Sequence, residues 1–193
     1  MKIKIKPNII KEIKEFAKNE CEKPTSKYGS GPFRYHFIPM VKYAKQLAKE
    51  LGKDVEVVEL AGWLHDIGSI IYGRENHHIT SAKIAENKLK ELNYPSKKIK
   101  LIKKCILSHR GSKNYKRISI EEKIISDADT MNCFDNIAGL FAAALVHEKL
   151  NQGEARKSVR RKLQNKWKQL CFKKSKEIIR PKYEAAMLLL NKK

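Results

Sequence analysis

The nonapeptide Ala61-Gly-Trp-Leu-His-Asp-Ile-Gly-Ser69 is the most informative part of this chain. It continues an apolar run that begins at Val57 and closes that run with His65 and Asp66 side by side. Imidazole and carboxylate together suit borderline or hard divalent cations. A carboxylate in the last turn of a helix also faces the negative end of the helix dipole, which is unfavourable unless a cation neutralises it. A lone His-Asp pair more often only ends a helix, so the rest of the chain must decide between the two interpretations.

Further histidines and aspartates stand around this pair in a definite order. One histidine precedes it, two blocks with histidine follow it, and a pair of aspartates comes last. The blocks are Arg34-Tyr-His36, His77-His-Ile-Thr-Ser-Ala82, Ile106-Leu-Ser-His-Arg110 and Asp127-Ala-Asp129. This order resembles the HD superfamily of metal-dependent phosphohydrolases, over about residues 30 to 147. Small stand-alone bacterial and archaeal hydrolases of that superfamily are the most similar.

The resemblance implies a divalent metal site. Its ligands would be His36, His65, Asp66 and Asp129, and the ion could be Mn, Fe, Co, Ni, Mg or Zn. Residues two apart face different sides of a regular helix, so only one of Asp127 and Asp129 should bind the ion. The family pattern selects Asp129 and leaves Asp127 to support the site or to cap a neighbouring helix.

A second metal ion is also compatible with the resemblance. Some superfamily members hold two ions, bridged by the motif aspartate and bound by two further histidines. His77 and His109 match those positions, with His78 as an alternative to His77. His109 could instead contact a phosphate or support another ligand. We expect His147, which lies outside every block, to have an ordinary core or surface role.

The ligand set indicates the chemistry. A divalent cation lowers the pKa of its bound water and polarises a phosphoryl oxygen, so that hydroxide can attack phosphorus at neutral pH. We expect Asp66 to be the catalytic carboxylate, binding the metal and orienting that water. Arg34, Arg74 and Arg110 lie next to the ligand blocks and could bind substrate phosphate or be surface charges.

One position departs from the family. Ser69 stands where many members have a lysine after the His-Asp-x-Gly sequence. This removes a frequent phosphate contact, and the Gly-Tyr-Pro motif of the cyclic-dinucleotide phosphodiesterases is absent too. The leading hypothesis is therefore a phosphohydrolase acting on a nucleotide or another small phosphorylated metabolite.

Three alternatives stay open. The same fold also supports di-iron oxygenases and phosphodiesterases. The third is a protein of a different class, which binds a polyanion or nucleic acid and uses its metal only for structure. The location of the cations separates this last hypothesis from the enzyme: they should converge on the metal in an enzyme and lie on an outer helix face in a binding protein.

The chain is strongly basic, with a formal net charge of +21. Residues 148–193 hold 15 Lys and Arg against 4 Asp and Glu. Five of these cations crowd one predicted helix: Arg156, Lys157, Arg160, Arg161 and Lys162. Such a surface can bind nucleic acid. No aromatic stacking platform accompanies the cluster, and it lies outside every ligand block, so a solvated helix face is the favoured interpretation.

The fold class follows from periodicity. Apart from the first six residues, which alternate, nearly every segment has helical spacing. A chain of 193 residues with 41% hydrophobic content is long enough for one domain with a substantial core. We therefore expect a single all-α HD-like bundle over residues 1–193, with the motifs in 34–130 and the basic C-terminal helices of 148–193 packed on the core.

Capping and breaking residues predict the helix limits. Asp54 and Ser96 should cap two helices, Thr80 or Ser81 should start another, and Ser119 with Glu122 should form a capping box. The remaining expected helices are 8–20, 33–51 with Pro39 in its first turn, 137–150 as a buried helix stopped by Gly153, and two C-terminal helices that divide near Arg180-Pro181.

Other features limit the setting. No apolar run approaches the roughly 18 residues of a membrane span, and the N-terminus lacks the apolar core of a signal peptide. We therefore expect a cytoplasmic protein without a membrane partner, either monomer or homodimer. The four cysteines form no Cys-x-x-Cys pair and are predicted to be small core residues.

Overall fold

The computed structural model describes residues 8–110 and 115–191, which form helices joined by short loops and contain no β-strand. The all-α expectation is confirmed; the alternating segment 1–6 lies outside the described residues. The helices are α1 (Ile9–Glu22), α2 (Ile38–Glu50), α3 (Val55–Leu64), α4 (Ile67–Tyr72), α5 (His77–Glu91), α6 (Ser96–Ser108), α7 (Ile120–Asn132), α8 (Ile137–Ala142), α9 (Gln152–Gln169) and α10 (Lys173–Leu190), with π-helical turns η1 (Phe33–Phe37) and η2 (Ala143–His147).

Helix α3 is the centre of the core. Asp54 caps it by accepting a hydrogen bond from the backbone N–H of Val57, as predicted, and every residue from Val57 to Leu64 is buried. It packs against α1, α2, α5, α6 and α7. A helix that is apolar on most sides is stable only inside such a shell. Each large side chain buried there contributes about 1.5–3 kcal/mol, and the helix delivers His65 and Asp66 into the interior.

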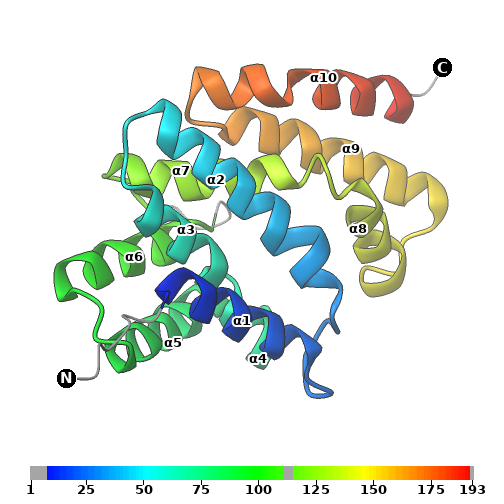
Figure 1. Ribbon diagram of the computed structural model, residues 1–193. Helices are drawn as coiled ribbons and strands as arrows, with labels where there is room; N and C mark the ends of the chain where they lie inside the picture. The colour runs from blue at the N-terminus through cyan, green and yellow to red at the C-terminus, as the bar shows by residue number, and fades with distance from the viewer. Residues whose placement is uncertain (1–7, 111–114, 192–193) are drawn as a thin grey trace, which may run out of the picture.

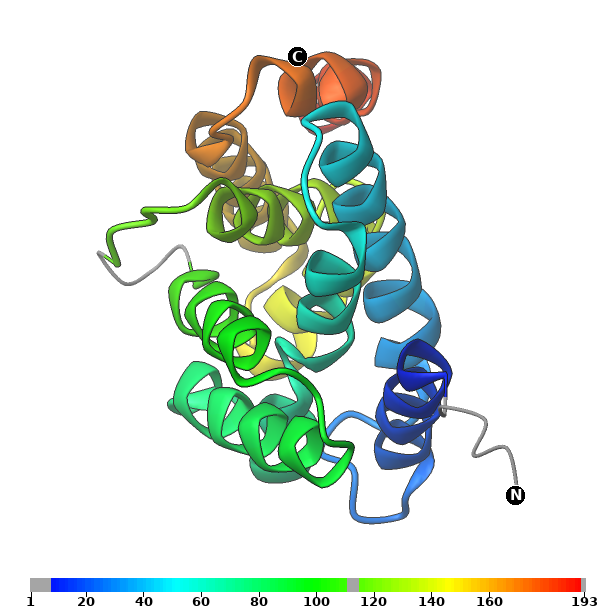
Figure 2. The same ribbon diagram turned by 60° about the vertical axis from the view of Figure 1, so that its left-hand side comes forward.

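The surrounding helices stack in pairs. Figure 1 shows α5 beside α6 at one end and α9 beside α10 at the other, with α2 crossing between them. In Figure 2 the helices α9, α7, α6 and α5 follow one another down one side of the molecule. Helix α7 joins the two ends because it packs on α2, α3 and α6 as well as on α9 and α10. No described helix is long and apolar enough to cross a bilayer.

Asp127 fixes the C-terminal helices to α7. Its carboxylate accepts hydrogen bonds from the backbone N–H groups of Cys171 (2.8 Å) and Phe172 (3.0 Å), where the chain turns from α9 into α10. A second contact joins α10 to α2 and to the turn after α7 through Lys182, Tyr43 and Asp135. The break between the last two helices therefore lies at residues 170–172.

Three predicted limits near the C-terminus were wrong. The last two helices do not divide at Arg180-Pro181: Pro181 lies inside α10, because the tertiary cap from Asp127 sets the break earlier. Gly153 does not stop a helix but is the second residue of α9, which is capped by Asn151. The predicted buried helix 137–150 ends early in η2, and Leu145 and Val146 are exposed.

Two helix starts also differ from prediction. Helix α5 begins at His77, not at Thr80 or Ser81. The Thr80 hydroxyl donates back to the carbonyl of His77, and the Ser81 hydroxyl accepts from the N–H of Gly68, so both are occupied within the fold instead of capping. Ser96 is the first residue of α6 and not its cap.

The helix predicted over 33–51 starts with a π turn. In an α-helix the N–H of residue 39 would bond the carbonyl of Tyr35, but Pro39 has no N–H. The chain forms η1 there and enters α2 at Ile38. Short helix α4, directly after Asp66, was not predicted. Cys21 and Cys105 are buried as expected, whereas Cys133 is half-buried and Cys171 is exposed.

Candidate metal centre

The ligand candidates lie mostly at helix ends. His36 is in η1, His65 ends α3 and Asp66 precedes α4. His77 opens α5 and His109 ends α6. Asp129 is the exception, inside α7. Helix ends let adjacent side chains such as His65 and Asp66 converge, which a regular helix prevents by turning about 100° per residue.

The first group surrounds one oxygen of Asp66. Nε2 of His36 lies 3.0 Å from Nε2 of His65, 3.4 Å from Asp66 Oδ2 and 3.9 Å from Asp129 Oδ1. Nε2 of His65 lies 3.8 Å from Asp66 Oδ2 and 3.9 Å from Asp129 Oδ1. The atoms of His36, His65 and Asp66 are close enough to hold one metal ion.

The second group surrounds the other oxygen of Asp66. Nε2 of His77 lies 3.1 Å from Oδ1 and Nε2 of His109 lies 3.5 Å from it. The two ring nitrogens are 3.2 Å apart. Together with Asp66 they form a second set of atoms that could hold a metal ion. Asp66 thus stands between two histidine groups, with one oxygen turned to each.

Backbone contacts orient three of the four imidazoles alike. Nδ1 of His65 lies 2.8 Å from the carbonyl of Gly62, Nδ1 of His77 lies 2.8 Å from that of Arg74, and Nδ1 of His109 lies 2.5 Å from that of Ile106. A carbonyl only accepts, so each Nδ1 carries the proton and donates it. Each Nε2 then presents a lone pair to the centre, which is the tautomer that a metal ligand needs.

This arrangement fits a divalent cation. When both rings are neutral, lone pairs of His77 and His109 face each other and Asp66 Oδ1, and that buried oxygen has no other donor near it among the described residues. Several acceptor atoms without a donor between them repel one another unless a cation lies among them. Two nitrogens and a carboxylate oxygen in each group match the donors of borderline divalent metals.

The charges of the cluster are set by its burial. Burial lowers the pKa of His65 to about 4, so this ring is neutral at neutral pH. Burial also favours a neutral His36, but contact with Asp66 and the charge of Asp129 raise its pKa above the usual value. Burial would raise the pKa of Asp66, yet the surrounding imidazoles hold it well below its usual range. Asp66 is therefore ionised.

Lys166 is a site residue that we did not predict. It lies on α9, and its ammonium is 3.7 Å from Asp129 Oδ2, the oxygen adjacent to the one that faces His36 and His65. Burial lowers the pKa of Lys166, but contacts with its neighbours, among them the carboxylate of Asp129, raise it by more. The sequence offered no signal, because Lys166 stands outside every motif in a helix rich in lysine.

The other predicted residues differ in their burial and in their contacts near the centre. His78 is buried beside Tyr115, with Nε2 2.9 Å from the hydroxyl oxygen, and is not in either group. Arg110 is half-buried and its charge reaches His77. Arg74 is exposed in the loop before α5, and its charge reaches Lys166. Arg34 is exposed, with its guanidinium over the ring of Tyr35.

Two residues lie away from the centre. Asp127 is fully buried and is occupied by the cap on Cys171 and Phe172, so the structure places Asp129 and not Asp127 beside the histidines. His147 is exposed in η2.

Asn132 is a residue of the centre that was not predicted: its side-chain amide lies 2.8 Å from Nδ1 of His36. Its position one turn after Asp129 on the same helix could have indicated it.

Comparisons with known proteins show the fold and the family of this chain. Three solved structures share the fold along nearly the whole chain. A Listeria innocua protein is 22% identical, covers 96% of this chain and 93% of its own, and has a TM-score of 0.73. An HD-superfamily hydrolase from Bacillus thuringiensis is 19% identical, with coverages of 94% and 92% and a TM-score of 0.73. A Lactobacillus plantarum protein is 18% identical, with coverages of 95% and 94% and a TM-score of 0.75.

At such identities the solved structures show the fold alone. A search of curated proteins gave no match. The family model of the HD domain matches residues 33–132, more than half of the chain. That range contains His36, the His65–Asp66 pair and Asp129. The chain therefore belongs to the HD-domain family.

Proposed function

We propose that this protein is a metal-dependent phosphohydrolase that acts on a nucleotide or another small phosphorylated metabolite. The observation that carries the proposal is Asp66, a partly buried carboxylate with one oxygen turned to His36 and His65 and the other to His77 and His109. Such a carboxylate suits two cations held side by side, an arrangement that enzymes use for displacement at phosphorus. The Bacillus thuringiensis relative is described as a hydrolase, which agrees with the proposal.

The chain's own groups supply the charges that this reaction needs. A bound divalent cation would lower the pKa of its water and polarise a phosphoryl oxygen. Asp66 stays ionised at neutral pH and can accept a hydrogen bond from the attacking water. His65 stays neutral above a pH of about 4 and keeps its Nε2 lone pair directed at the centre.

Cationic side chains near the centre favour a phosphate substrate. Lys166 is beside Asp129, Arg110 is near His77, and Arg74 acts on Lys166 from the opposite loop. These cations come from α9, from the end of α6 and from the loop before α5, so they approach the metal groups from several sides. Lys and Arg bind phosphoryl oxygens by charge-assisted hydrogen bonds. This convergence supports the enzyme over a protein whose metal site is only structural.

The test combines metal analysis with a screen for phosphate release. The purified protein is loaded with manganese, iron, cobalt, nickel, magnesium or zinc and assayed on nucleoside mono-, di- and triphosphates and on sugar phosphates. We expect release from at least one class, and we expect Asp66→Ala and His65→Ala to lose both metal and activity while the helical circular dichroism persists.

His147→Ala is the matched control, because it removes an exposed imidazole outside both metal groups. It should keep metal content and activity at the wild-type level. Metal content that is equal in wild type and Asp66→Ala would refute the site. Full metal occupancy without release of phosphate from any substrate would refute the reaction.

A further inference from the structure

The basic residues of α9 are neighbours in sequence but differ in their contacts. The guanidinium of Arg156 donates hydrogen bonds to the carbonyls of Leu189, Leu190 and Asn191 and so caps the end of α10. This cation is structural. The remaining basic residues of α9 lie on different sides of the helix.

One side of α9 leads to the metal centre. Ser158, Lys162 and Lys166 are spaced by four residues, so they follow one another along a single face. Lys166 reaches Asp129 of the centre, and Lys162, one turn earlier, is paired with Glu148. Hydrogen bonding to Lys162 lowers the pKa of the Glu148 carboxyl, and the charge of Arg74 lowers it further. Arg74 therefore lies within electrostatic range of both Glu148 and Lys166.

A surface cavity continues from that face. It has a volume of about 440 Å³ and is lined by Glu148, Leu150, Glu154, Lys157, Ser158 and Arg161. Its two carboxylates are already occupied, Glu148 by Lys162 and Glu154 by the backbone N–H of Asn151. Within the part of the chain that the structure describes, no carboxylate lies within salt-bridge distance of Lys157 or Arg161. These two cations are available to an anion.

We propose that Lys157 and Arg161, together with Lys162 and Lys166, whose ion pairs with Glu148 and Asp129 would be shared with phosphate oxygens, form a phosphate-binding track along α9. This track binds a short single-stranded oligonucleotide whose terminal phosphate lies at the metal centre. This inference rests on the proposed phosphohydrolase reaction, because it assumes that the phosphate that reacts is held at the metal centre, and it extends the substrate from a single nucleotide to a short oligonucleotide. It reverses the expectation of a merely solvated helix face, since that expectation depended on the basic cluster being remote from the ligands.

The length of the track decides the class of ligand. From Lys166 to Lys157 the helix rises about 14 Å, at 1.5 Å per residue. A nucleotide triphosphate chain is too short to reach both ends. A single strand with stacked bases, at the spacing of about 3.4 Å per nucleotide that one strand of a duplex has, covers this distance in roughly four nucleotides. The ligand therefore carries several phosphates in a row, separated as in a phosphodiester backbone.

Two exposed apolar side chains that are close in sequence to Arg74 and Glu148 favour a nucleic acid over a purely ionic polyphosphate. Tyr72, two residues before Arg74, is 66% exposed, and Val146, two residues before Glu148, is 68% exposed. Bases can pack on such groups, whereas inorganic polyphosphate has no surface to cover them. Contacts of this kind do not discriminate between base sequences.

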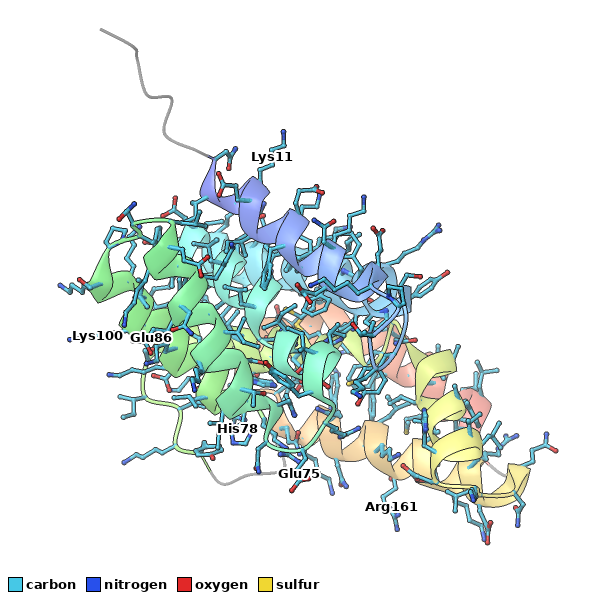
Figure 3. The ribbon with its side chains drawn as sticks, turned by 90° about the horizontal axis from the view of Figure 1, so that it is seen from below. Lys11, Glu75, His78, Glu86, Lys100 and Arg161 are labelled. Carbon is cyan, nitrogen blue, oxygen red and sulfur yellow. The ribbon has the colours of Figure 1, made fainter. Side chains whose placement is uncertain are left out.

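The experiment compares two charge-matched double variants. Lys157→Gln/Arg161→Gln removes two track cations. Lys97→Gln/Lys100→Gln removes two exposed cations at the start of α6, and Figure 3 shows Lys100 and Arg161 far apart on the molecule. The probe is a fluorescein-labelled single-stranded tetranucleotide with phosphorothioate linkages, which resists hydrolysis. Its affinity for the metal-loaded protein is measured by anisotropy as the salt concentration is raised.

We expect the track variant to bind the probe more weakly and with a shallower salt dependence. The slope of log affinity against log salt should fall by about 0.7 for each phosphate that the variant no longer neutralises, or about 1.4 in total. The Lys97→Gln/Lys100→Gln variant should match wild type. Equal losses in both variants would show a general charge effect and overturn the track, as would no loss in either.

A competition experiment identifies the class of ligand, and measuring binding and phosphate release separately distinguishes the track from the proposed function. Inorganic polyphosphate of equal phosphate number should displace the probe less well than an unlabelled oligonucleotide; better displacement would overturn the oligonucleotide assignment.

Binding of the probe does not require turnover. A track confirmed by binding in a protein that releases no phosphate would refute the proposed function alone, and phosphate release with an equal salt slope in all variants would refute the track alone.

Discussion

The side-chain amide of Asn132 lies 2.8 Å from Nδ1 of His36, where the other three histidines of the centre each meet a backbone carbonyl. With Nδ2 in that place, Oδ1 of Asn132 is buried without a hydrogen-bond partner among the described residues. A half-turn of the amide exchanges its two ends and gives up only the long contact, 3.4 Å, from Nδ2 to the carbonyl of Tyr35. Oδ1 then accepts the Nδ1 proton of His36, and all four Nε2 lone pairs face the centre.

Asn132 should therefore control metal affinity at the first group. We expect Asn132→Ala to weaken metal binding by roughly 10- to 100-fold, as removal of a group that orients a ligand does. Asn132→Asp should retain affinity, because a carboxylate also accepts the Nδ1 proton. Calorimetric titration with metal measures the affinity of both variants. The control is Asn136→Ala, which removes an amide that caps α8 instead; an equal loss in both alanine variants would contradict the role.

The two histidine groups predict two metal ions per chain. Each group has its own oxygen of Asp66, so the sites can fill together. Under metal-replete conditions elemental analysis should find about two ions in wild type and about one in His77→Ala/His109→Ala. His78→Ala should keep two, because His78 is in neither group. A wild-type stoichiometry of one would leave His77 and His109 to contact substrate or support the ligands.

Local patterns predicted the helices well where the partner of a polar residue is near in sequence. Asp54 and the Ser119–Glu122 capping box are set within four residues, and both form as expected. Two of the errors involve partners far along the chain, whereas the cap at Asn151 and the bond from Thr80 to His77 are local. Ser81 looked like a cap but bonds Gly68, and the end of α9 is fixed by Asp127, 44 residues before Cys171. No periodicity in one segment contains such a contact.

The site divides in the same way. Histidines and aspartates of the motifs could be placed because their order is a specific signature, and the structure brings six of them together. Lys166 could not be found, since its approach to Asp129 depends on how α9 packs on α7. The exposed Leu145 and Val146 were wrongly expected in the core because apolar composition alone does not tell which segment finds a partner.

Substitutions of Asp127 and of Asp129 should have different effects on metal binding and on stability. Asp129→Asn removes a carboxylate beside His36 and His65, and we expect it to lose metal from the first group. Asp127→Asn replaces one of the two accepting oxygens at Cys171 and Phe172 with a donor. It should keep its metal and lose about 1–3 kcal/mol of unfolding free energy. Elemental analysis and urea denaturation check the pair, and the reverse pattern would mean that the roles are exchanged.

Acid should weaken the start of α3 through Asp54 and Glu56. Burial raises the pKa of Asp54, but the contact with Lys98 and the N–H of Val57 lower it by more. A hydrogen bond from Tyr94 lowers the pKa of Glu56. Both folded-state values lie below the unfolded ones, so the carboxylates stabilise the fold above a pH of about 4. That stability is lost as the pH falls through the folded-state values.

Asp54→Asn/Glu56→Gln isolates this effect, because asparagine still caps a helix. The variant should be less stable than wild type at neutral pH, and the difference should shrink as the pH falls below about 4. Urea denaturation across a pH series measures it. Glu184→Gln is the control, an exposed carboxylate on α10. A difference that is the same at every pH would rule out the ionic contribution.

Gly68 should be the glycine that the centre tolerates least. It lies in α4 against the start of α5, and a Cβ there would meet Thr80 Oγ1, stand 2.6 Å from the backbone N of Ser81 and 2.9 Å from the carbonyl O of His77. Backbone atoms of a packed helix cannot withdraw easily, so we expect Gly68→Ala to cost about 1–3 kcal/mol. It should also lower metal content at the second group, because it displaces His77.

The comparison is Gly153→Ala, in the first turn of α9. The nearest atom to a Cβ there is Asn151 Oδ1 at 3.5 Å, an ordinary contact. Alanine in a helix is favoured over glycine by about 0.5–1 kcal/mol, so this variant should melt at a higher temperature than wild type with its metal unchanged. Thermal unfolding and elemental analysis of both variants test the close approach of α4 and α5. A Gly68→Ala protein as stable and as metal-rich as wild type would mean that these helices can move apart without disturbing His77.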